Sequence, residues 1–395
     1  MSTLSSIISY PNIRTAEGGR LMERVPIQPQ TLAWARQVSG LTVSELANAI
    51  GVKAKQIDAF ETGTAKPTFK QLVNVAKKLD RTPAFFFTEP PAQADVPPTV
   101  DFRQSPEADG LDAATTKALR RAERYREIML EYSQPSHAGI TFPTAFHWGT
   151  EQQAAAAMRS LLELEPSFVP TGPTKDAGFK MWRDLLENHG IMVFQTSDVE
   201  RGVFRGLSVY HDVLPIVLLN GKDSSAGKTF TLFHELGHLI NRSSGLCLLE
   251  ETDTEEALVN SFAAHFLMPG AAVSEKLSGL DSDDLVDVIA THFKVSRVAA
   301  AIRLKNLGVV NESAVKREMS LSNSAWKQER DQMKKKEAGP AYWRMRYRDL
   351  GATYVGTVAR ALEEEKISIL DASYFLDSRV PTVDKLIDAY RSEAG

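Results

Sequence analysis

The 395-residue sequence contains one cysteine, Cys247, and no long apolar run. A single cysteine excludes an intrachain disulfide and a cysteine-based zinc cluster, and it is typical of a protein from the reducing cytoplasm. The sequence predicts no transmembrane helix, and its N-terminus lacks the basic and apolar segments of a secretory signal. The formal net charge is only -4, so any nucleic-acid-binding surface must be local.

Hydrophobic periodicity divides the chain into helical and strand-containing regions. Four short helical patterns follow one another between residues 31 and 80. Prolines between Pro90 and Pro98 cannot continue a helix and predict a stiff linker. Further on, helical patterns precede three short strands, at residues 191–196, 206–211 and 215–220, which are rich in Val, Ile and Leu. More helices follow, so the chain is expected to be mainly α with one α+β region.

The stretch TFTLFHELGHLI, from Thr229 to Ile240, contains the pattern His-Glu-x-x-His. Residues four apart lie on one face of a helix, so His234 and His238 would present two imidazoles side by side. Glu235 is placed to take a proton from a metal-bound water. The same letters also occur in buried amphipathic helices that bind no metal. Here the apolar flanks predict burial, which is costly for such a polar set without a metal or tight hydrogen bonds.

A catalytic zinc takes three protein ligands, so a third ligand must come from elsewhere in the chain. The segment after the motif offers Glu251, Glu255 and Glu256 as candidates. Glu256 forms an i,i+4 pair with Asn260, which is suited to orient a ligand through a hydrogen bond, and Glu255 is the main alternative. His265 is out of helical phase with Glu256 and is expected to be a partly buried or surface histidine.

These segments together resemble the ImmA/IrrE type of metallopeptidase domain. The resemblance rests on GKTFTLFHELGHLI and EEALVNSFAAHFLMP, with the upstream RGLSVYHDVLPIVLLN and the downstream HFKVSRVAAAIRLKNLG, and it spans roughly residues 170 to 310. It implies a gluzincin-like zinc endopeptidase in which His234, His238 and Glu256 hold Zn²⁺ and Glu235 is the general base. The chain departs from the family at GKTF, where an arginine is more usual, and this change is expected to affect neighbouring contacts rather than the metal.

The first helical patterns are typical of a helix-turn-helix unit. Ala47 and Gly51 are small where two helices are expected to cross, and Val52 and Ile57 are expected to fill the space between them. The residues expected to face outward, where a recognition helix reads base edges in the major groove, are Lys53, Ala54, Lys55, Gln56 and Ala59.

Between residues 28 and 90, eight Lys or Arg offset five Asp or Glu, which leaves a local charge of +3. The segment LANAIGVKAKQIDAFETGTAKPT resembles the XRE (Cro/repressor) helix-turn-helix family, and this resemblance implies binding to double-stranded operator DNA, often as a homodimer. A small helical bundle that binds a protein partner is the alternative.

Five segments follow from these patterns. Residues 1–27 are expected to be a flexible tail, with translation starting at Met1 or Met22. Residues 28–88 are the all-α helix-turn-helix domain, 89–110 the linker, 111–310 the zincin-like α+β metallopeptidase domain and 311–395 a C-terminal helical region. The basic stretch 316–348 is expected to be a solvated helix face rather than a nucleic-acid site.

Three other features are assigned no chemistry. Asp371 and Asp377 are expected to be helix caps and surface charges. Trp34, Trp182 and Tyr210 are expected to be core residues. Cys247 is expected to be a small hydrophobe near the metal site, with a ligand or redox role as the alternative.

The sequence supports two functional hypotheses. The first is a cytoplasmic DNA-binding regulator whose zinc endopeptidase domain cleaves a specific, repressor-like regulatory protein. The second is a DNA-binding repressor or antitoxin whose metal site is structural or sensory and performs no turnover. The substitution Glu235→Gln distinguishes them, because it removes the base and leaves the metal ligands in place.

Overall fold

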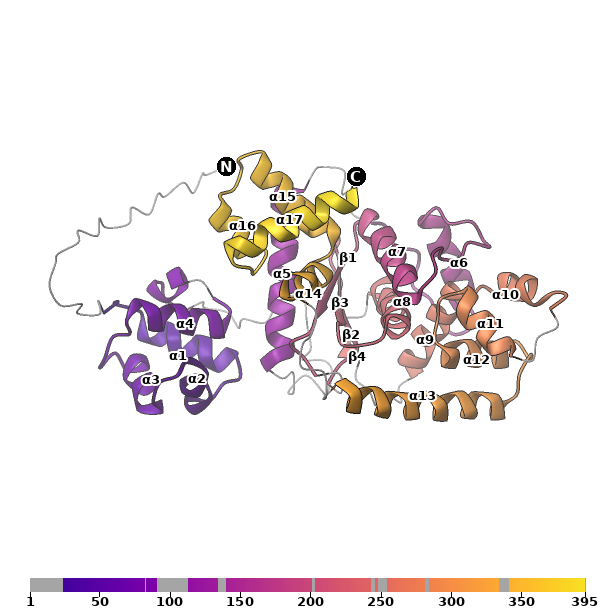
Figure 1. Cartoon of the computed structure of the whole chain (residues 1–395), viewed down its shortest axis with the longest axis horizontal. Coiled ribbons are helices and arrows are strands. Elements are labelled where there is room, and N and C mark those ends of the chain that lie inside the picture. The colour runs from indigo at the N-terminus through magenta and orange to yellow at the C-terminus, as the bar shows by residue number, and fades with distance from the viewer. Residues whose placement is uncertain are drawn as a thin grey trace. The chain divides into compact units, whose positions relative to one another are not determined.

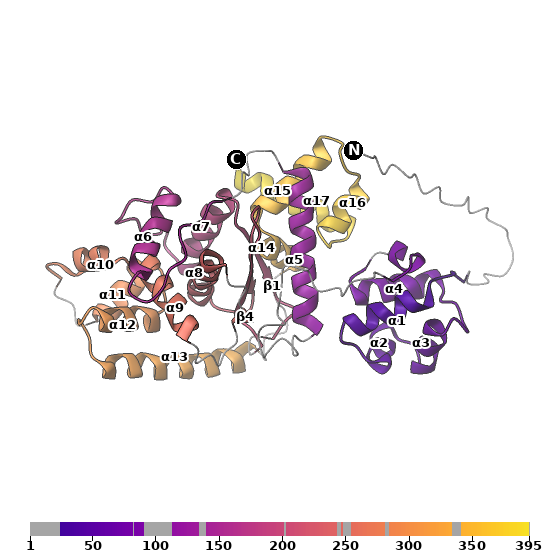
Figure 2. The same cartoon turned by 180° about the vertical axis from the view of Figure 1, so that it is seen from behind.

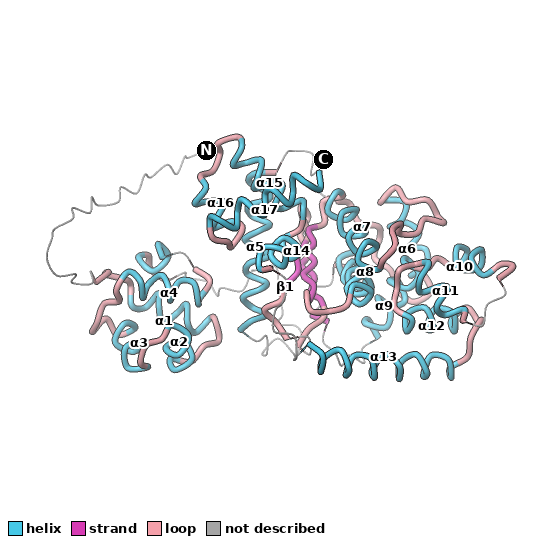
Figure 3. The backbone as a smooth tube through the Cα atoms, in the orientation of Figure 1, coloured by secondary structure: helices cyan, strands magenta, loops and turns pink. Residues whose placement is uncertain are grey.

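The structure is a computed structural model that describes residues 24–81, 83–90, 113–133, 140–200, 203–242, 246–247, 254–280, 284–333 and 341–394 (Figures 1 and 3). Contacts divide the chain into two compact units, Met1–Asp95 and Val96–Gly395. Most of the predicted tail and linker, residues 1–23 and 91–110, lie outside the described residues. Each unit has its own hydrophobic core and is considered separately below.

The first unit is a small all-α domain, as predicted. Its elements are α1 (Pro29–Val38), α2 (Val43–Ile50), α3 (Ala54–Glu61), α4 (Phe69–Leu79) and the 3₁₀ helix η1 (Pro83–Phe87). Capping boxes begin two of the helices: the side chains of Thr42 and Thr68 each accept a hydrogen bond from the backbone N–H three residues later, and their own backbone N–H groups donate to that residue's side chain. The buried core includes Leu32, Leu46, Ile57, Phe60 and Leu72.

The prediction that Ala47 and Gly51 are small because two helices cross closely holds for Ala47 and is wrong for Gly51. Ala47 is buried between the helices, as expected for a close crossing. Gly51 has no atom within 4 Å of the position where its Cβ would stand, so the crossing does not require it. Its backbone instead has a φ of 72° at the C-terminal cap of α2, a left-handed conformation that glycine adopts without steric cost.

The second unit is built on a four-stranded sheet. The strands are β1 (Met192–Thr196), β2 (Gly206–Val209), β3 (Ile216–Asn220) and β4 (Leu246–Cys247), in the order β1-β3-β2-β4. β1 pairs with β3 in parallel, whereas β2 is antiparallel to both β3 and β4. The first three strands confirm the prediction. β4 was not predicted, since a two-residue strand leaves no periodic signal in a sequence.

Helices cover both faces of this sheet, which makes the unit a three-layer structure (Figures 1 and 2). The layer that contains the His-Glu-x-x-His helix, here called the metal face, consists of α6 (Glu151–Leu161), α7 (Lys175–Asn188), α8 (Ser225–Asn241), α9 (Thr254–Leu267), α10 (Gly270–Leu277), α11 (Leu285–His292) and α12 (Arg297–Asn306). A long helix, α13 (Glu312–Met333), packs against α12.

The other layer, here called the C-terminal face, consists of α5 (Ala113–Tyr132), α14 (Tyr342–Leu350), α15 (Ala352–Glu363), α16 (Ile369–Phe375) and α17 (Val380–Ala394). Alternate residues of β1 serve the two layers: Val193 points to the metal face, while Met192 and Phe194 point to the C-terminal face. The helices predicted for residues 311–395 therefore complete the same compact unit as the metallopeptidase segment.

Two predictions about the C-terminal region of the chain need correction. The basic stretch is solvated at the start of α13, where Arg317 is 67% exposed, but Arg346 in α14 is only 11% exposed and packs inward. Asp371 does cap a helix, α16, through Ser368. Asp377 is instead half-buried, with its side chain 19% exposed, and it pairs with arginines that are distant in sequence rather than standing as an isolated surface charge. Helical periodicity does not reveal the positions of Arg346 and Asp377, because both depend on what packs against their segments.

No single described helix is long and apolar enough to cross a membrane, although the bent pair α9 and α10 meets the length and composition test together. Of the predicted core residues, Trp182 is fully buried, whereas Trp34 and Tyr210 are partly buried. The side chain of Cys247 lies outside the described residues, so its predicted role stays a prediction.

Candidate metal centre

Helix α8 carries the His-Glu-x-x-His pattern through the middle of the domain. Ser224 caps its start by accepting a hydrogen bond from the Gly227 backbone, and Arg242, in the left-handed conformation, ends it. Every residue from Thr231 to Ile240 is buried, because the helix packs on the sheet, α7 and α9. The motif is thus part of the domain core.

Gly237, inside the motif, lets α9 approach α8 closely. A Cβ at this position would stand 3.2 Å from Phe262 Cδ1 and 3.2 Å from Val259 Cβ, which is tighter than ordinary van der Waals contact. The same helix α9 carries Glu256 near its beginning. The glycine therefore sets the helix spacing at which a carboxylate from α9 reaches the histidines of α8.

The imidazoles of His234 and His238 meet the Glu256 carboxylate at one point. Glu256 Oε2 lies 2.8 Å from His234 Nε2, and Oε1 lies 3.0 Å from His238 Nε2. The two Nε2 atoms are 3.2 Å apart, and the donor atoms of the three residues all lie within 4.8 Å of one another. His234 and His238 are 6% and 2% exposed.

These three residues fit a catalytic zinc ion. Zinc takes imidazole nitrogen and carboxylate oxygen at about 2.0–2.2 Å, and three protein ligands leave a fourth position for water or substrate. Nε2 atoms 3.2 Å apart have the separation expected of two ligands on one such ion. Two imidazoles and a carboxylate buried together would otherwise be an expensive polar set. The geometry therefore supplies a candidate metal centre.

Asn260 orients the first histidine. Its Oδ1 lies 3.0 Å from His234 Nδ1, and an amide oxygen can only accept a hydrogen bond. His234 Nδ1 therefore donates in this contact, and Nε2 is the nitrogen that faces Glu256. The i,i+4 relation between Glu256 and Asn260 in the sequence thus places both of them against the same histidine.

The charges at the centre support one another. Burial by itself would raise the pKa of Glu256, but hydrogen bonds from His234 and His238 hold it well below its ordinary value. Burial opposes the charged form of His238, yet its hydrogen bond with Glu256 and the nearby carboxylates of Glu235, Glu256 and Glu255 raise its pKa. The surroundings are rich in negative charge, which favours a bound cation.

The other candidate ligands are less well placed. The Glu255 side chain is 49% exposed, and its Oε1 lies 3.9 Å from His238 Nδ1, the nitrogen that faces away from Glu256. Glu251 lies outside the described residues. His265 is partly buried and its ring contacts the guanidinium of Arg303, as expected for a histidine that is not a ligand.

Glu235 is completely buried and lies against the backbone of β2. A Cβ at Gly206 would stand 2.6 Å from Glu235 Oε1 and 2.4 Å from Thr231 Cγ2, so only glycine fits at this point of the strand. Gly206 also pairs with Cys247 of β4, which covers the outer edge of β2 beside the carboxylate. The sequence reasoning missed Gly206, although a glycine at the start of a strand is a signal for close backbone approach.

Lys228 occupies the GKTF segment that departs from the family pattern. It is buried, it donates a hydrogen bond to Gln195 Oε1 at 3.0 Å, and its ammonium lies 4.7 Å from the centre of the Phe179 ring. Burial lowers its pKa to about 8. These contacts join α8 to β1 and α7 and do not reach the histidines, in agreement with the expected effect on neighbouring contacts.

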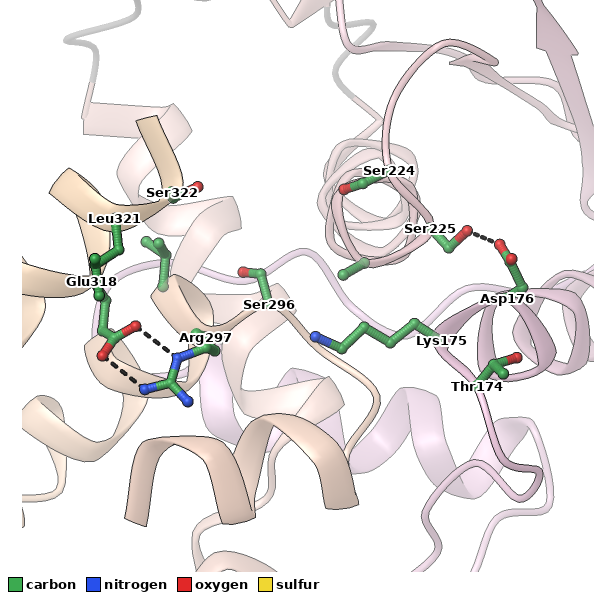
Figure 4. Close-up of a pocket in the computed structure, with 12 residues that line it drawn as sticks. Thr174, Lys175, Asp176, Ser224, Ser225, Ser296, Arg297, Glu318, Leu321 and Ser322 are labelled. Atoms are coloured by element: carbon green, nitrogen blue, oxygen red, sulfur yellow. Dashed lines mark hydrogen bonds and ion pairs between the residues drawn. The ribbon is translucent and has the colours of Figure 1, made fainter. Parts of the chain in front are cut away.

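A separate pocket of about 620 Å³ lies at the N-terminal end of α8 (Figure 4). Its walls come from the first turns of α7, α8 and α12 and from one side of α13. Ser225 is hydrogen-bonded to Asp176, and Arg297 forms an ion pair with the buried Glu318. None of the residues that line it belongs to the metal centre, so this pocket is separate from the candidate catalytic residues.

The predicted DNA-contacting residues surround the first turns of α3. Lys53 and Lys55 are exposed, and Gln56 and Ala59 are partly exposed. Ala54 packs partly against the domain core, so it does not face fully outward as predicted. Its position one turn before the buried residue Ile57 explains the difference, because the two share a helix face.

Comparison with known proteins covers both regions. Residues 32–86 match the helix-turn-helix family model, and residues 186–305 match the peptidase family model described as the IrrE N-terminal-like domain. The chain joins an XRE-type helix-turn-helix domain to an ImmA/IrrE-type domain. No curated protein matches the chain. The IrrE-like match contains the sheet residues of β1 to β3 and both helices of the metal centre, whereas α5 and α14 to α17 lie outside it.

The two matches agree with the fold predicted from the sequence, which is mainly α with one α+β domain. The helix-turn-helix domain makes the chain a DNA-binding regulator of the XRE type. The second match places the candidate metal centre inside a domain of a peptidase family.

Proposed function

We propose that this XRE-type regulator is a cytoplasmic zinc endopeptidase that cleaves a specific, repressor-like regulatory protein. The convergence of His234, His238 and Glu256 on one point, next to the buried Glu235, is the observation that carries the proposal. The family resemblance implies zinc, and the donor set fits it. Operator DNA is the proposed partner of the first domain, bound by a homodimer through Lys53, Lys55, Gln56 and Ala59 with support from the partly packed Ala54.

Each residue has a proposed role in peptide hydrolysis. His234, His238 and Glu256 would hold the zinc, which when bound would act as a Lewis acid and lower the pKa of water. Glu235 takes a proton from the attacking water and passes it to the leaving amine. Asn260 fixes the orientation of His234 through the hydrogen bond at Nδ1.

The surroundings of the centre favour a selective protease over a general one. The histidines are nearly inaccessible, and β4 already pairs with the edge of β2 beside Glu235. Donor atoms that are nearly inaccessible leave a short peptide few contacts of its own at this centre. A partner protein that supplies further contacts is the better substrate for such a site.

Metal content tests the ligands. We expect about one zinc per chain in the purified wild-type protein, and we expect it to be lost in His234→Ala and in Glu256→Ala. Glu255→Gln is the matched control, since it alters the neighbouring carboxylate of the same helix and should retain zinc. Wild-type protein that binds no metal after zinc is supplied would exclude the hydrolase.

Glu235→Gln separates the enzyme from the second hypothesis, a repressor or antitoxin with a structural or sensory metal. We expect this variant to keep its zinc and to lose cleavage. The measurement is a comparison of newly formed protein N-termini in cells that express wild type or Glu235→Gln. Cleavage products that are the same in both, or absent from both, favour the regulator without turnover.

A further inference from the structure

Residues 140–147, here called the strap, run past the metal centre and lead into α6. They form no helix or strand of their own. Phe146 is buried and Phe142 is half-buried, whereas Thr144 and Ala145 are exposed. The strap supplies no ligand to the candidate metal, and it lies outside residues 186–305, which match the IrrE-like family model. The family match therefore assigns it no role.

One end of the strap is anchored on the last residue of α8. Asn241 Oδ1 accepts a hydrogen bond from the Phe146 backbone N–H at 2.9 Å, and Asn241 Nδ2 donates to the Phe146 carbonyl at 3.4 Å. The Phe146 ring also stacks on Phe262 of α9, with ring centroids 4.9 Å apart. Asn241 comes three residues after His238, so the two are neighbours on the helix surface. This anchor therefore stands beside the second histidine.

The other end of the strap rests beside the sheet. The Phe142 ring lies 6.3 Å from the ring of Tyr210, which directly follows β2. The guanidinium of Arg242 lies 5.2 Å from the centre of the same Tyr210 ring. Arg242 comes four residues after His238 and is also its neighbour on the surface of α8. The contact of Phe142 therefore lies at the same level of α8 as the anchor at Asn241.

The strap crosses α8 from one side to the other. Four residue steps from Phe142 to Phe146 let the main chain span up to about 13 Å, and a helix with its side chains is about 10–12 Å wide. One end of the strap contacts the residue after β2 and the other contacts α9, and α8 packs on both β2 and α9. The strap therefore passes over the metal-bearing side of α8 about one turn beyond His238.

Few interactions hold the strap in place. Within the described part of the chain, Phe146 is the only one of residues 140–146 whose main chain takes part in a hydrogen bond. By contrast, α9 is held against α8 by the stacked rings of Phe233 and Phe266, whose centroids lie 4.3 Å apart. Segments with exposed residues and few hydrogen bonds open at a lower free energy than the core around them. The strap is therefore the element beside the metal centre that opens most readily.

The proposed hydrolysis requires an opening at this place. His234 and His238 are 6% and 2% exposed, whereas a catalytic metal must offer its fourth position to a substrate carbonyl. α9 carries Glu256, and β2 lies against Glu235, so a movement of either element would disturb a ligand or the base. The strap carries none of these residues, so it can move while the centre stays intact.

We propose that the strap gates the metal centre: its Phe142 end lifts from Tyr210 to admit a polypeptide, and Phe146 stays on Asn241 as the pivot. The gate is a regulation of the proposed peptidase site, and it rests on the proposed function for the identity of what enters. A partner protein that holds the strap open would be a better substrate than a free peptide. The access of a reagent to the histidines can be measured without metal and without turnover.

Chemical labelling of the metal-free full chain tests the gate. Diethyl pyrocarbonate acylates accessible imidazoles, and mass spectrometry gives the rate at each histidine. In the wild type, His238 should react at least about ten-fold more slowly than the exposed His147. Phe142→Ala removes the contact with Tyr210 and should speed the reaction of His238 at least about five-fold. A wild-type rate in folded Phe142→Ala, or equal rates at His238 and His147 in the wild type, would overturn the proposal.

Matched controls separate the gate from a general loosening of the domain. Phe168→Ala removes another half-buried phenylalanine that packs on the same core away from the strap, and it should label like wild type. Equal acceleration in Phe168→Ala and Phe142→Ala would contradict the gate. If Phe142→Ala does not fold, as judged by circular dichroism, Asn241→Ala decides the question, because it weakens the pivot and should also speed the labelling of His238. Its control is Asn306→Ala, at the exposed last residue of α12.

Zinc content separates this proposal from the hydrolase. A chain that binds no zinc but labels faster in Phe142→Ala would exclude the hydrolase and support the gate. A zinc-loaded chain whose labelling is unchanged in Phe142→Ala and Asn241→Ala would exclude the gate and leave the hydrolase. In zinc-loaded protein, a chelator should remove the metal at least about five-fold faster from Phe142→Ala than from wild type. The equilibrium affinity for zinc should stay the same, because no ligand is altered.

Discussion

The two faces of the sheet contain half-buried or buried polar clusters whose charges are of opposite sign. On the metal face, the carboxylates of Glu235, Glu255 and Glu256 surround two histidines. On the C-terminal face, three arginines surround Asp377. Burial penalises either excess charge, so each cluster is stable only with a compensating partner. The comparison shows that one sheet packs a carboxylate-rich cluster on one side and an arginine-rich cluster on the other.

The substitution with the largest expected effect on stability removes the carboxylate at the centre of the arginines. Asp377→Asn should lower the free energy of unfolding by about 3 kcal/mol, because it takes this carboxylate away from arginines that are half-buried. Asparagine tolerates the backbone at this position, where φ is 46°, so the change tests charge rather than strain. Denaturant unfolding measures the loss. Asp388→Asn, at an exposed position, is the control, and equal stability of the two variants would show that Asp377 is not a structural charge.

The next largest effect concerns the buried ammonium of Lys228, whose pKa is lowered to about 8 by burial. Between about pH 8 and the ordinary lysine value, the unfolded chain binds more protons than the folded one, so stability should rise with pH across this window. The rise corresponds to roughly 3 kcal/mol. Below pH 8 both states are protonated and the full cost of burial remains.

Lys228→Met should therefore be more stable than wild type below pH 8 and should lack this part of the rise above it. Unfolding curves at a series of pH values measure both effects. Lys180→Met, at a position 53% exposed, should leave the profile unchanged. A wild-type profile that stays parallel to that of Lys228→Met would show that the ammonium is not buried in solution.

A smaller effect is expected where α8 and α9 meet. Gly237→Ala should cost about 1–2 kcal/mol, because its methyl group presses on Phe262 and Val259. It should also weaken zinc binding about ten-fold, since the helix that carries Glu256 must move outward. Competition with a zinc chelator measures the affinity. Gly270→Ala is the control, because its Cβ would make only ordinary contacts. Unchanged zinc affinity in Gly237→Ala would show that the spacing of α8 and α9 at Gly237 does not control the position of Glu256.

The smallest effect on stability is expected in the helix-turn-helix unit, where an exposed residue is replaced. Lys55→Ala, at an exposed position of α3, should leave stability unchanged and weaken binding to DNA. The slope of log affinity against log salt concentration should fall in magnitude by about one. Filter binding at several salt concentrations measures this. Lys77→Ala, exposed on α4, is the matched control, and an equal effect of the two substitutions would remove α3 from its role as the recognition helix.

The sequence predicted much of the metal centre because helical periodicity is local. The spacing of His234 and His238 and the pair Glu256 and Asn260 each follow from one turn of a helix, and the structure brings all four together. Gly206 could not be linked to Glu235 in the same way, since a strand and a helix about 30 residues apart meet only in the folded chain. β4 was too short to give a pattern.

The cluster around Asp377 was missed for a similar reason. Arg124 and Asp377 are 253 residues apart, and each stands in a segment whose charges look like ordinary surface charge. A charge pattern in a sequence shows which residues are available, whereas burial decides which of them need a partner.

The sequence by itself determined the two domain types, the helices and the local pairs of ligands, because each of these depends on residues within a few turns of one another. Only the tertiary structure decided that the C-terminal helices cover the second face of the sheet, that Gly237 sets the distance between α8 and α9, and that arginines from separate helices enclose Asp377. The physical reason is that close packing and the burial of charge arise between segments that are distant in the chain, and no local pattern records them.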